Sequence, residues 1–81
     1  LGNNPQETFS IYPNPASNGY VNITSFFSGV KTVSVYGILG KKVMTATISS
    51  SILNISELKS GVYILKIIQN EISSTKKLVI K

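Results

Sequence analysis

Short runs of alternating hydrophobic and polar residues fill most of the chain, and such alternation is typical of β-strands with one buried face. The runs cover residues 9–12, 20–24, 31–36, 41–48 and 52–55. Each run places apolar side chains, such as Val33 and Val35, on a single face. Stretches rich in Gly, Pro, Asn and Ser separate the runs, and no segment has a helical period. The pattern predicts an all-β chain.

The last third of the chain carries the strongest apolar signal. Residues 62–68 are β-prone except for Lys66, a polar turn around Gln69 and Asn70 follows, and a second apolar run covers residues 78–80. Apolar residues on both faces of the first run predict a strand in the middle of a packed sheet. The chain is therefore expected to end inside its own core.

These runs make seven strands at spacings of about ten residues, which predicts a seven-stranded antiparallel β-sandwich of immunoglobulin-like type. The chain lacks the Cys and Trp of antibody domains. We expect Phe26 and Phe27 to cover one end of the core and Leu58 to fold back onto it. A bulge near Val43 would resolve the mixed faces of the fourth strand.

The length of 81 residues allows a single domain. Residues 1–8 are polar and contain a Pro, so they are expected to be the end of a linker, and residues 9–81 the domain. The first residue is Leu1 rather than Met, which suggests a fragment of a longer protein. No apolar run approaches the roughly 18 residues needed to span a membrane, and residues 1–8 do not resemble a signal peptide.

The formal net charge of +5 comes from lysines and raises the question of a nucleic-acid partner. The chain has no Arg, the residue best suited to bidentate base and phosphate contacts. The lysines are spread out, with pairs only at residues 41–42 and 76–77. We therefore expect no nucleic-acid partner, and we interpret most strand lysines as guards against edge-to-edge aggregation.

The residues needed for catalysis are scarce. The chain has no His, Cys or Asp, and Glu7, Glu57 and Glu71 fall in the linker and in two turns. A Ser-His-Asp or Cys-His nucleophile, a pair of catalytic carboxylates and a zinc or calcium site are all unsupported. We expect a domain that is not an enzyme and that binds no metal or cofactor.

Four short motifs follow one another along the chain. They are YPNPA at residues 12–16, V-x-VY-x-x-x-GKKV at residues 33–43, L-x-I-x-x-L-x-x-GVYILK at residues 53–66, and KKLVIK at residues 76–81. This ordered set resembles the type A C-terminal sorting domain of the Bacteroidota type IX (Por) secretion system. The resemblance covers residues 9–81. One departure is Gly37, where the family often has Asp, and it affects only the detail of that turn.

The resemblance implies a seven-stranded β-sandwich at the end of a larger exported protein. Such domains follow an N-terminal cargo domain that folds in the periplasm, and an outer-membrane translocon and its shuttle protein recognise them. A sortase-like cysteine protease commonly removes them, leaving the cargo attached to the cell surface or released outside the cell. Family cleavage sites correspond here to a position within or just before residues 1–8.

Nine residues match positions of the family motifs, and these are the expected recognition positions. They are Pro13, Pro15, Gly40, Gly61, Tyr63, Lys76, Lys77, Val79 and Lys81. The prolines and glycines could equally serve only the fold, as strand ends and turns, and Tyr63 could pack at the core or its rim. Folding does not demand a terminal Lys81, so residues 76–81 are the stronger candidates for recognition.

One hypothesis is that the translocon reads an exposed edge of the last strand together with the terminal lysines, as in β-augmentation. An alternative is an immunoglobulin-like accessory module that binds carbohydrate or protein beside a secreted enzyme. Such binders present aromatic platforms, whereas the four tyrosines are scattered along the sequence at residues 12, 20, 36 and 63. A passive spacer domain is a third reading.

Overall fold

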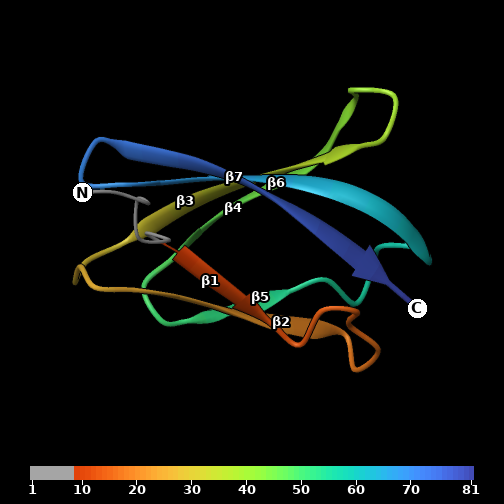
Figure 1. The fold of residues 1–81 in the computed structure, drawn as a ribbon, viewed down its shortest axis with the longest axis horizontal. Helices are drawn as coiled ribbons and strands as arrows, with labels where there is room; N and C mark the ends of the chain where they lie inside the picture. Colours follow the sequence, from red (N-terminus) through yellow and green to blue (C-terminus); the bar gives the residue numbers. More distant parts are fainter. Residues whose placement is uncertain (1–8) are drawn as a thin grey trace, which may run out of the picture.

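The computed structural model describes residues 9–81, so the predicted linker and cleavage region at residues 1–8 lie outside the described part. Seven strands form two antiparallel sheets that pack face to face (Figure 1). Sheet A has the order β1-β2-β5, and sheet B has the order β4-β3-β6-β7. The strands are β1 (Phe9–Tyr12), β2 (Tyr20–Ser25), β3 (Lys31–Gly37), β4 (Lys42–Ile48), β5 (Ile52–Asn54), β6 (Gly61–Gln69) and β7 (Ile72–Ile80). The predicted all-β, seven-stranded class is confirmed.

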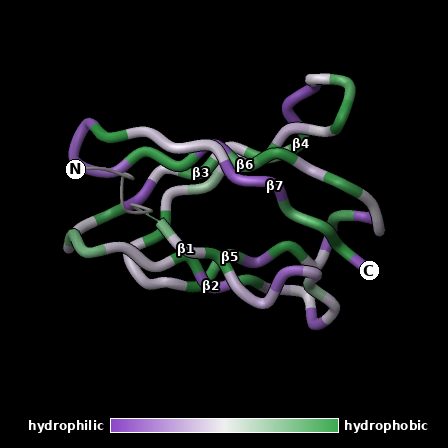
Figure 2. The backbone as a smooth tube through the Cα atoms, in the orientation of Figure 1, coloured by the Kyte–Doolittle hydropathy of each residue, from purple (hydrophilic) through white to green (hydrophobic). Residues whose placement is uncertain are grey.

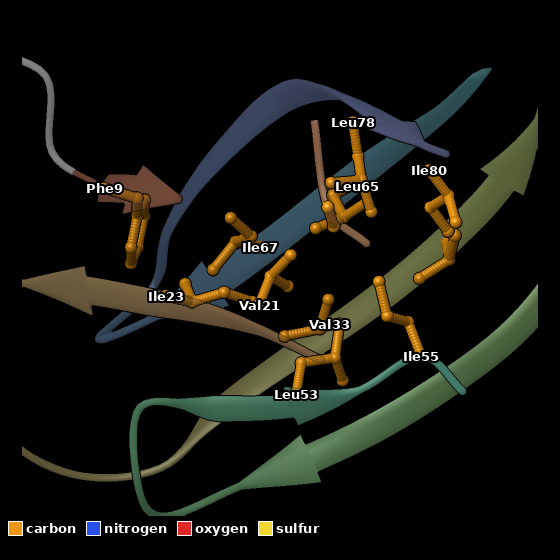
Figure 3. Close-up of a cluster of buried hydrophobic side chains, with 12 residues drawn as sticks. Phe9, Val21, Ile23, Val33, Leu53, Ile55, Leu65, Ile67, Leu78 and Ile80 are labelled. Carbon is orange, nitrogen blue, oxygen red and sulfur yellow. The ribbon is translucent and has the colours of Figure 1, made fainter. Parts of the chain in front are cut away.

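The core consists of apolar side chains from the facing surfaces of the two sheets (Figure 3). Most strands alternate between more buried and more exposed positions, because successive side chains of a strand point to opposite faces; in β4 the inward positions are half-buried. The buried apolar residues are Phe9, Ala16, Val21, Ile23, Val33, Val35, Leu53, Ile55, Leu65, Ile67, Leu78 and Ile80. Burial of these side chains is the main force that holds the sheets together.

Two local predictions are confirmed. The register between β3 and β4 shifts so that Val35 lies opposite Met44 and Tyr36 opposite Lys42, which leaves Val43 as the extra residue of a bulge. The bulge lets Met44 face the core while Val43 is exposed. Leu58, in the connection from β5 to β6, packs against the core as expected.

The prediction that Phe26 and Phe27 cover one end of the core is wrong. Phe26 is 83% exposed, and Phe27 also lies at the surface. Gln69 occupies that end instead and is only 2% exposed. Its side-chain nitrogen donates to the Gly29 carbonyl at 2.9 Å, and its side-chain oxygen accepts from the Ser25 hydroxyl at 2.5 Å. These two bonds tie the end of β2 and the connection that follows it to the end of β6.

The terminal hairpin is longer than the apolar pattern predicted. β7 begins at Ile72 rather than near residue 78, because Asn70 and Glu71 form a two-residue turn with φ of 54° and 65°. Turns with positive φ at both central residues match the twist of paired strands, so pairing starts immediately after the turn. β6 lies between β3 and β7 as expected, but only its inner face is covered, and Val62 and Ile68 are exposed on the outer face.

Candidate functional site

The outer edge of β7 is partly covered by the connection that follows β1. Ala16 in this connection forms an isolated parallel bridge with Ile80. The Ala16 amide donates to the Val79 carbonyl, and the Lys81 amide donates to the Ala16 carbonyl, both at 2.8 Å. Ala16 is fully buried at this contact. We call residues 14–16 the clamp segment.

The Asn14 side chain extends the clamp along β7. Its Nδ2 donates to the Lys77 carbonyl at 2.9 Å, and its Oδ1 accepts from the Val79 amide at 3.0 Å. A carboxamide has one donor group and one acceptor, so it supplies the two bonds that a neighbouring strand would supply. Pro13 and Pro15 flank Asn14, and both are preceded by cis peptide bonds. The clamp and the last residues of β7 therefore form one hydrogen-bonded unit.

The expected exposed edge at the end of β7 is therefore wrong for residues 77–81. Backbone and side-chain groups of the clamp already pair with this part of the edge. Within residues 9–81, no strand or bridge covers the outer edge from residue 72 to residue 76. β-Augmentation at the carboxyl-terminal end of β7 would first require displacement of the clamp.

The three lysines of the last motif point in different directions. Lys76 lies opposite Leu65 on the inner face of sheet B and is half-buried. Lys77 lies opposite Ile64 on the outer face and is exposed, and Lys81 is exposed just after β7. An inward-pointing charge on an edge strand hinders pairing with a second molecule, so Lys76 has a structural use that Lys77 and Lys81 lack.

Gly61 and Tyr63 stand at the start of β6, beside the end of β7. Gly61 pairs with Ile80, and its φ of 154° falls where side chains are disfavoured. Tyr63 pairs with Leu78 and packs against the rim of the core, as expected. Its hydroxyl donates to the Lys59 carbonyl at 2.6 Å, which fixes the connection before β6.

Gly40 belongs to the turn between β3 and β4. Its φ is 94°, and its amide donates to the Gly37 carbonyl at 2.9 Å. The Gly37 amide in turn donates to the Lys41 carbonyl at 2.8 Å. Gly37 pairs with Tyr63, so this turn lies at the same end of sheet B as the start of β6. The β3–β4 turn and the carboxyl-terminal end of β7 both lie on the right of Figure 1, whereas Lys76 and Lys77 pair with Leu65 and Ile64 nearer the middle of the β6–β7 hairpin.

Lysines dominate the charge of this end. Exposed lysines at this end occupy positions 41, 42, 59, 77 and 81, and Glu57 is the nearby carboxylate. An open groove of about 380 Å³ lies between β4 and β5 and is lined by Val43, Met44, Asn54, Ser56, Glu57 and Leu58. Within residues 9–81, no three His, Cys, Asp or Glu side chains are grouped closely enough to hold a metal ion.

Asn14 and Gln69 are the two polar residues whose roles the sequence did not predict. Asn14 was part of a family motif in which only the two prolines were expected to matter, and Gln69 was assigned to a turn. The one signal available for Asn14 was its position between two prolines, which cannot donate backbone hydrogen bonds. For Gln69 the signal was its place in the alternation of β6, in phase with Leu65 and Ile67.

The described residues contain no helix long and apolar enough to cross a membrane. A comparison with curated proteins finds no match. Residues 10–81 match the profile of a family described as the secretion system C-terminal sorting domain. The match spans nearly the whole chain and includes both the clamp and the end of β7. The chain therefore belongs to the family of type IX secretion C-terminal sorting domains.

Proposed function

We propose that residues 9–81 are a non-catalytic signal that carries an N-terminal cargo domain of the same chain from the periplasm through the outer-membrane translocon. In this proposal the shuttle protein receives the domain, and a sortase-like cysteine protease cleaves within or just before residues 1–8. The cargo then stays on the cell surface or is released. The family match by itself indicates a type IX secretion C-terminal sorting signal.

The proposal rests on the hydrogen-bonded contact between the first and the last of the four motifs. Residues 14–16 and residues 77–81 are far apart in sequence, yet hydrogen bonds join them along one edge. A partner that binds this end meets both motifs at once, and only in the folded domain. This supports recognition of a folded surface rather than of an extended terminal peptide.

We also propose that the sandwich is immunoglobulin-like. The strand order of the two sheets supports this proposal. Strands β1, β2 and β5 correspond to strands A, B and E of the immunoglobulin fold, and β3, β6 and β7 correspond to its strands C, F and G. β4 pairs with β3 rather than with β5, so it takes the place of an additional strand beside C. The absence of a catalytic constellation from the sequence supports a binding role for this scaffold.

Among the nine expected positions, we assign recognition to Lys77 and Lys81, because both are exposed beside the clamp. The other positions keep this end in shape. Pro13 and Pro15 frame the clamp, Gly40 and Gly61 occupy positive-φ positions, and Tyr63 packs at the rim. Lys76 guards the edge from the inner face, and Val79 supplies the groups that the clamp binds.

Secretion of a reporter protein fused before residues 1–81 tests the proposal, in hosts with and without the type IX translocon. Deleting residues 78–81 is a poor test, because it removes the buried Leu78 and Ile80 and thereby unfolds the domain. The double variant Lys77→Glu and Lys81→Glu leaves the core intact. The double variant Lys59→Glu and Lys66→Glu changes the net charge equally at two exposed positions outside the clamp and its partners, and is its control. We expect export of the wild type only with the translocon, and a selective loss in the first double variant. Normal export of the folded Lys77→Glu and Lys81→Glu variant would contradict the role of these lysines.

A second candidate function rests on two tyrosines. Tyr12 lies opposite Asn22 on the outer face of sheet A, and Tyr20 lies two residues from Asn22 on that same face. Both rings are exposed, so they form a small aromatic surface of the kind that accessory carbohydrate modules use. Retarded migration of the domain in polysaccharide gels, lost in Tyr12→Ala, would support this alternative.

A further inference from the structure

The turn between β3 and β4 exposes two large apolar side chains. Leu39 is 96% exposed and Ile38 is 74% exposed. In Figure 1 this turn projects beyond the sandwich, away from sheet A, and Figure 2 shows apolar residues at its tip beside hydrophilic ones. Tight turns usually carry Gly, Asn, Asp or Ser at such positions. Folding therefore does not account for Ile38 and Leu39.

The turn is held in a defined shape. Two backbone hydrogen bonds close it, from the Gly40 amide to the Gly37 carbonyl and from the Gly37 amide to the Lys41 carbonyl. A partner that binds the tip would therefore not have to order it, and pre-organised binding elements lose less free energy on association. The turn therefore presents Ile38 and Leu39 in a fixed position in which a partner can bind them.

Lysines and further apolar side chains continue from the tip onto the outer face of sheet B. The cross-strand row behind the tip is Lys42, Tyr36, Ile64 and Lys77, taken from β4 to β7. The Lys42 Nζ lies 6.0 Å from the centre of the Tyr36 ring. Val62, in the row closer to the tip, is exposed on the same face. Within residues 9–81, no strand of sheet B contains Asp or Glu, so no carboxylate lies on the outer face of its strands.

We infer that the β3–β4 tip and this adjoining row form one docking surface for a protein of the secretion machinery. The fitting partner surface is an apolar pocket that receives Leu39 and Ile38 and that carries carboxylates on its rim facing Lys41, Lys42 and Lys77. The inference rests on the proposed function, because it names the surface by which the machinery would hold the domain. The proposed function assigns recognition to Lys77 and Lys81. The docking surface adds an apolar anchor, Ile38 and Leu39, on a separate turn.

Charge spacing favours a protein over phosphate-bearing ligands. Lys42 and Lys77 lie in strands three places apart, so their backbones are about 14 Å apart and cannot close on one phosphate group. A protein rim can carry carboxylates at that spacing. The tip also has no Trp, Tyr or Phe, the residues that anchor proteins at a lipid interface. A carboxylate-rimmed pocket matches both the apolar centre and the lysines around it.

The test compares two pairs of exposed apolar residues in the same reporter fusion. The double variant Ile38→Ser and Leu39→Ser removes the anchor, and the double variant Phe26→Ser and Val30→Ser removes exposed apolar side chains at the other end of the domain. Because all four side chains are exposed, both variants should melt within about 3 °C of the wild type. We expect export to fall at least tenfold in the anchor variant and to be unchanged in the control. The charge variant Lys41→Glu and Lys42→Glu should also reduce export.

The possible results separate the two proposals. Wild-type export that does not depend on the translocon would overturn the proposed function itself. Translocon-dependent export that is equal in the wild type and the folded anchor variant would overturn only the docking surface. The membrane alternative is tested by sedimentation of the fusion protein with phosphatidylglycerol–phosphatidylcholine vesicles. Binding that is lost in the anchor variant would replace the protein partner by a lipid surface and overturn the inference.

Discussion

The substitution Asn14→Ala tests the clamp most directly. It removes the carboxamide that binds β7 at two points, the Lys77 carbonyl and the Val79 amide. The Asn14 side chain is exposed and belongs to no part of the core, so its removal leaves no cavity. Backbone bonds from Ala16 to Val79 and Lys81 are untouched. The change therefore isolates the side-chain half of the clamp.

The expected loss of stability is modest but measurable. A hydrogen bond in a folded protein contributes about 0.5–1.5 kcal/mol net. Both Asn14 bonds lie at the surface, where water can replace them, so the pair should contribute about 1–1.5 kcal/mol. For a domain of this size, 1 kcal/mol shifts the melting temperature by roughly 4–8 °C. We expect the variant to melt about 4–12 °C below the wild type.

Thermal unfolding followed by circular dichroism measures the shift, and amide hydrogen exchange localises it. The Val79 amide should exchange at least tenfold faster in the variant, whereas the amides of central strand β6 should change only with global stability. Asn18→Ala is the matched control, since Asn18 is an exposed residue of the same connection. Equal melting temperatures for the wild type and Asn14→Ala, with unchanged exchange at Val79, would refute the clamp as a stabilising contact.

Three further substitutions have defined outcomes. Gly40→Ala should lower the free energy of unfolding by about 1–2 kcal/mol, because φ at Gly40 is 94°. Gly37→Ala in the same turn is the control: the nearest atom to its new Cβ is a backbone oxygen at 3.8 Å, so the change measured by urea unfolding should stay below about 0.5 kcal/mol. Gln69→Ala should lower the free energy of unfolding by about 1–3 kcal/mol, because two part-buried hydrogen bonds are lost; a loss below about 0.5 kcal/mol would count against that role. Lys76→Ile should raise light scattering, because the inward charge that protects the edge of β7 is lost. Lys77→Ile should raise it less, and equal scattering from the two variants would argue against this role of Lys76.

The sandwich was predictable from the sequence because each strand keeps one face toward the core. The alternation of Val33 and Val35 with polar neighbours fixed both the strand and its buried face. The change of phase at Val43 pointed to a bulge, since a residue added to one strand shifts the alternation after it. Such signals are local, so a single sequence carries them.

The predictions failed where we assumed that hydrophobic residues are buried and that strands carry an apolar pattern. Phe26 and Phe27 are hydrophobic but lie in a connection, and the structure fills that end of the core with Gln69, whose polar groups are satisfied by the connection itself. The first half of β7 was missed because its Ser, Thr and Lys residues give no apolar signal on an edge strand. There the turn at residues 70–71, rather than hydrophobicity, sets the strand length.

The candidate site was predicted only as separate motifs. The positions of Lys76, Lys77 and Lys81 in the sequence could not reveal that the first points inward and the other two outward, because that depends on register with β6. Nor could the role of Asn14 be predicted, because its partners lie more than sixty residues away along the chain. Contacts at such separation leave no local pattern.

This long separation has a consequence for the order in which the chain is made. The clamp is synthesised before its partners Lys77 and Val79, which follow Asn14 by 63 and 65 residues. At a translation rate of roughly 5–20 residues per second, the clamp waits several seconds for them. A polypeptide that terminates before Val79 never closes this end of the sandwich. This end of the domain therefore closes only after Val79 has been made, and a receptor specific for the closed form would reject a chain truncated before that residue.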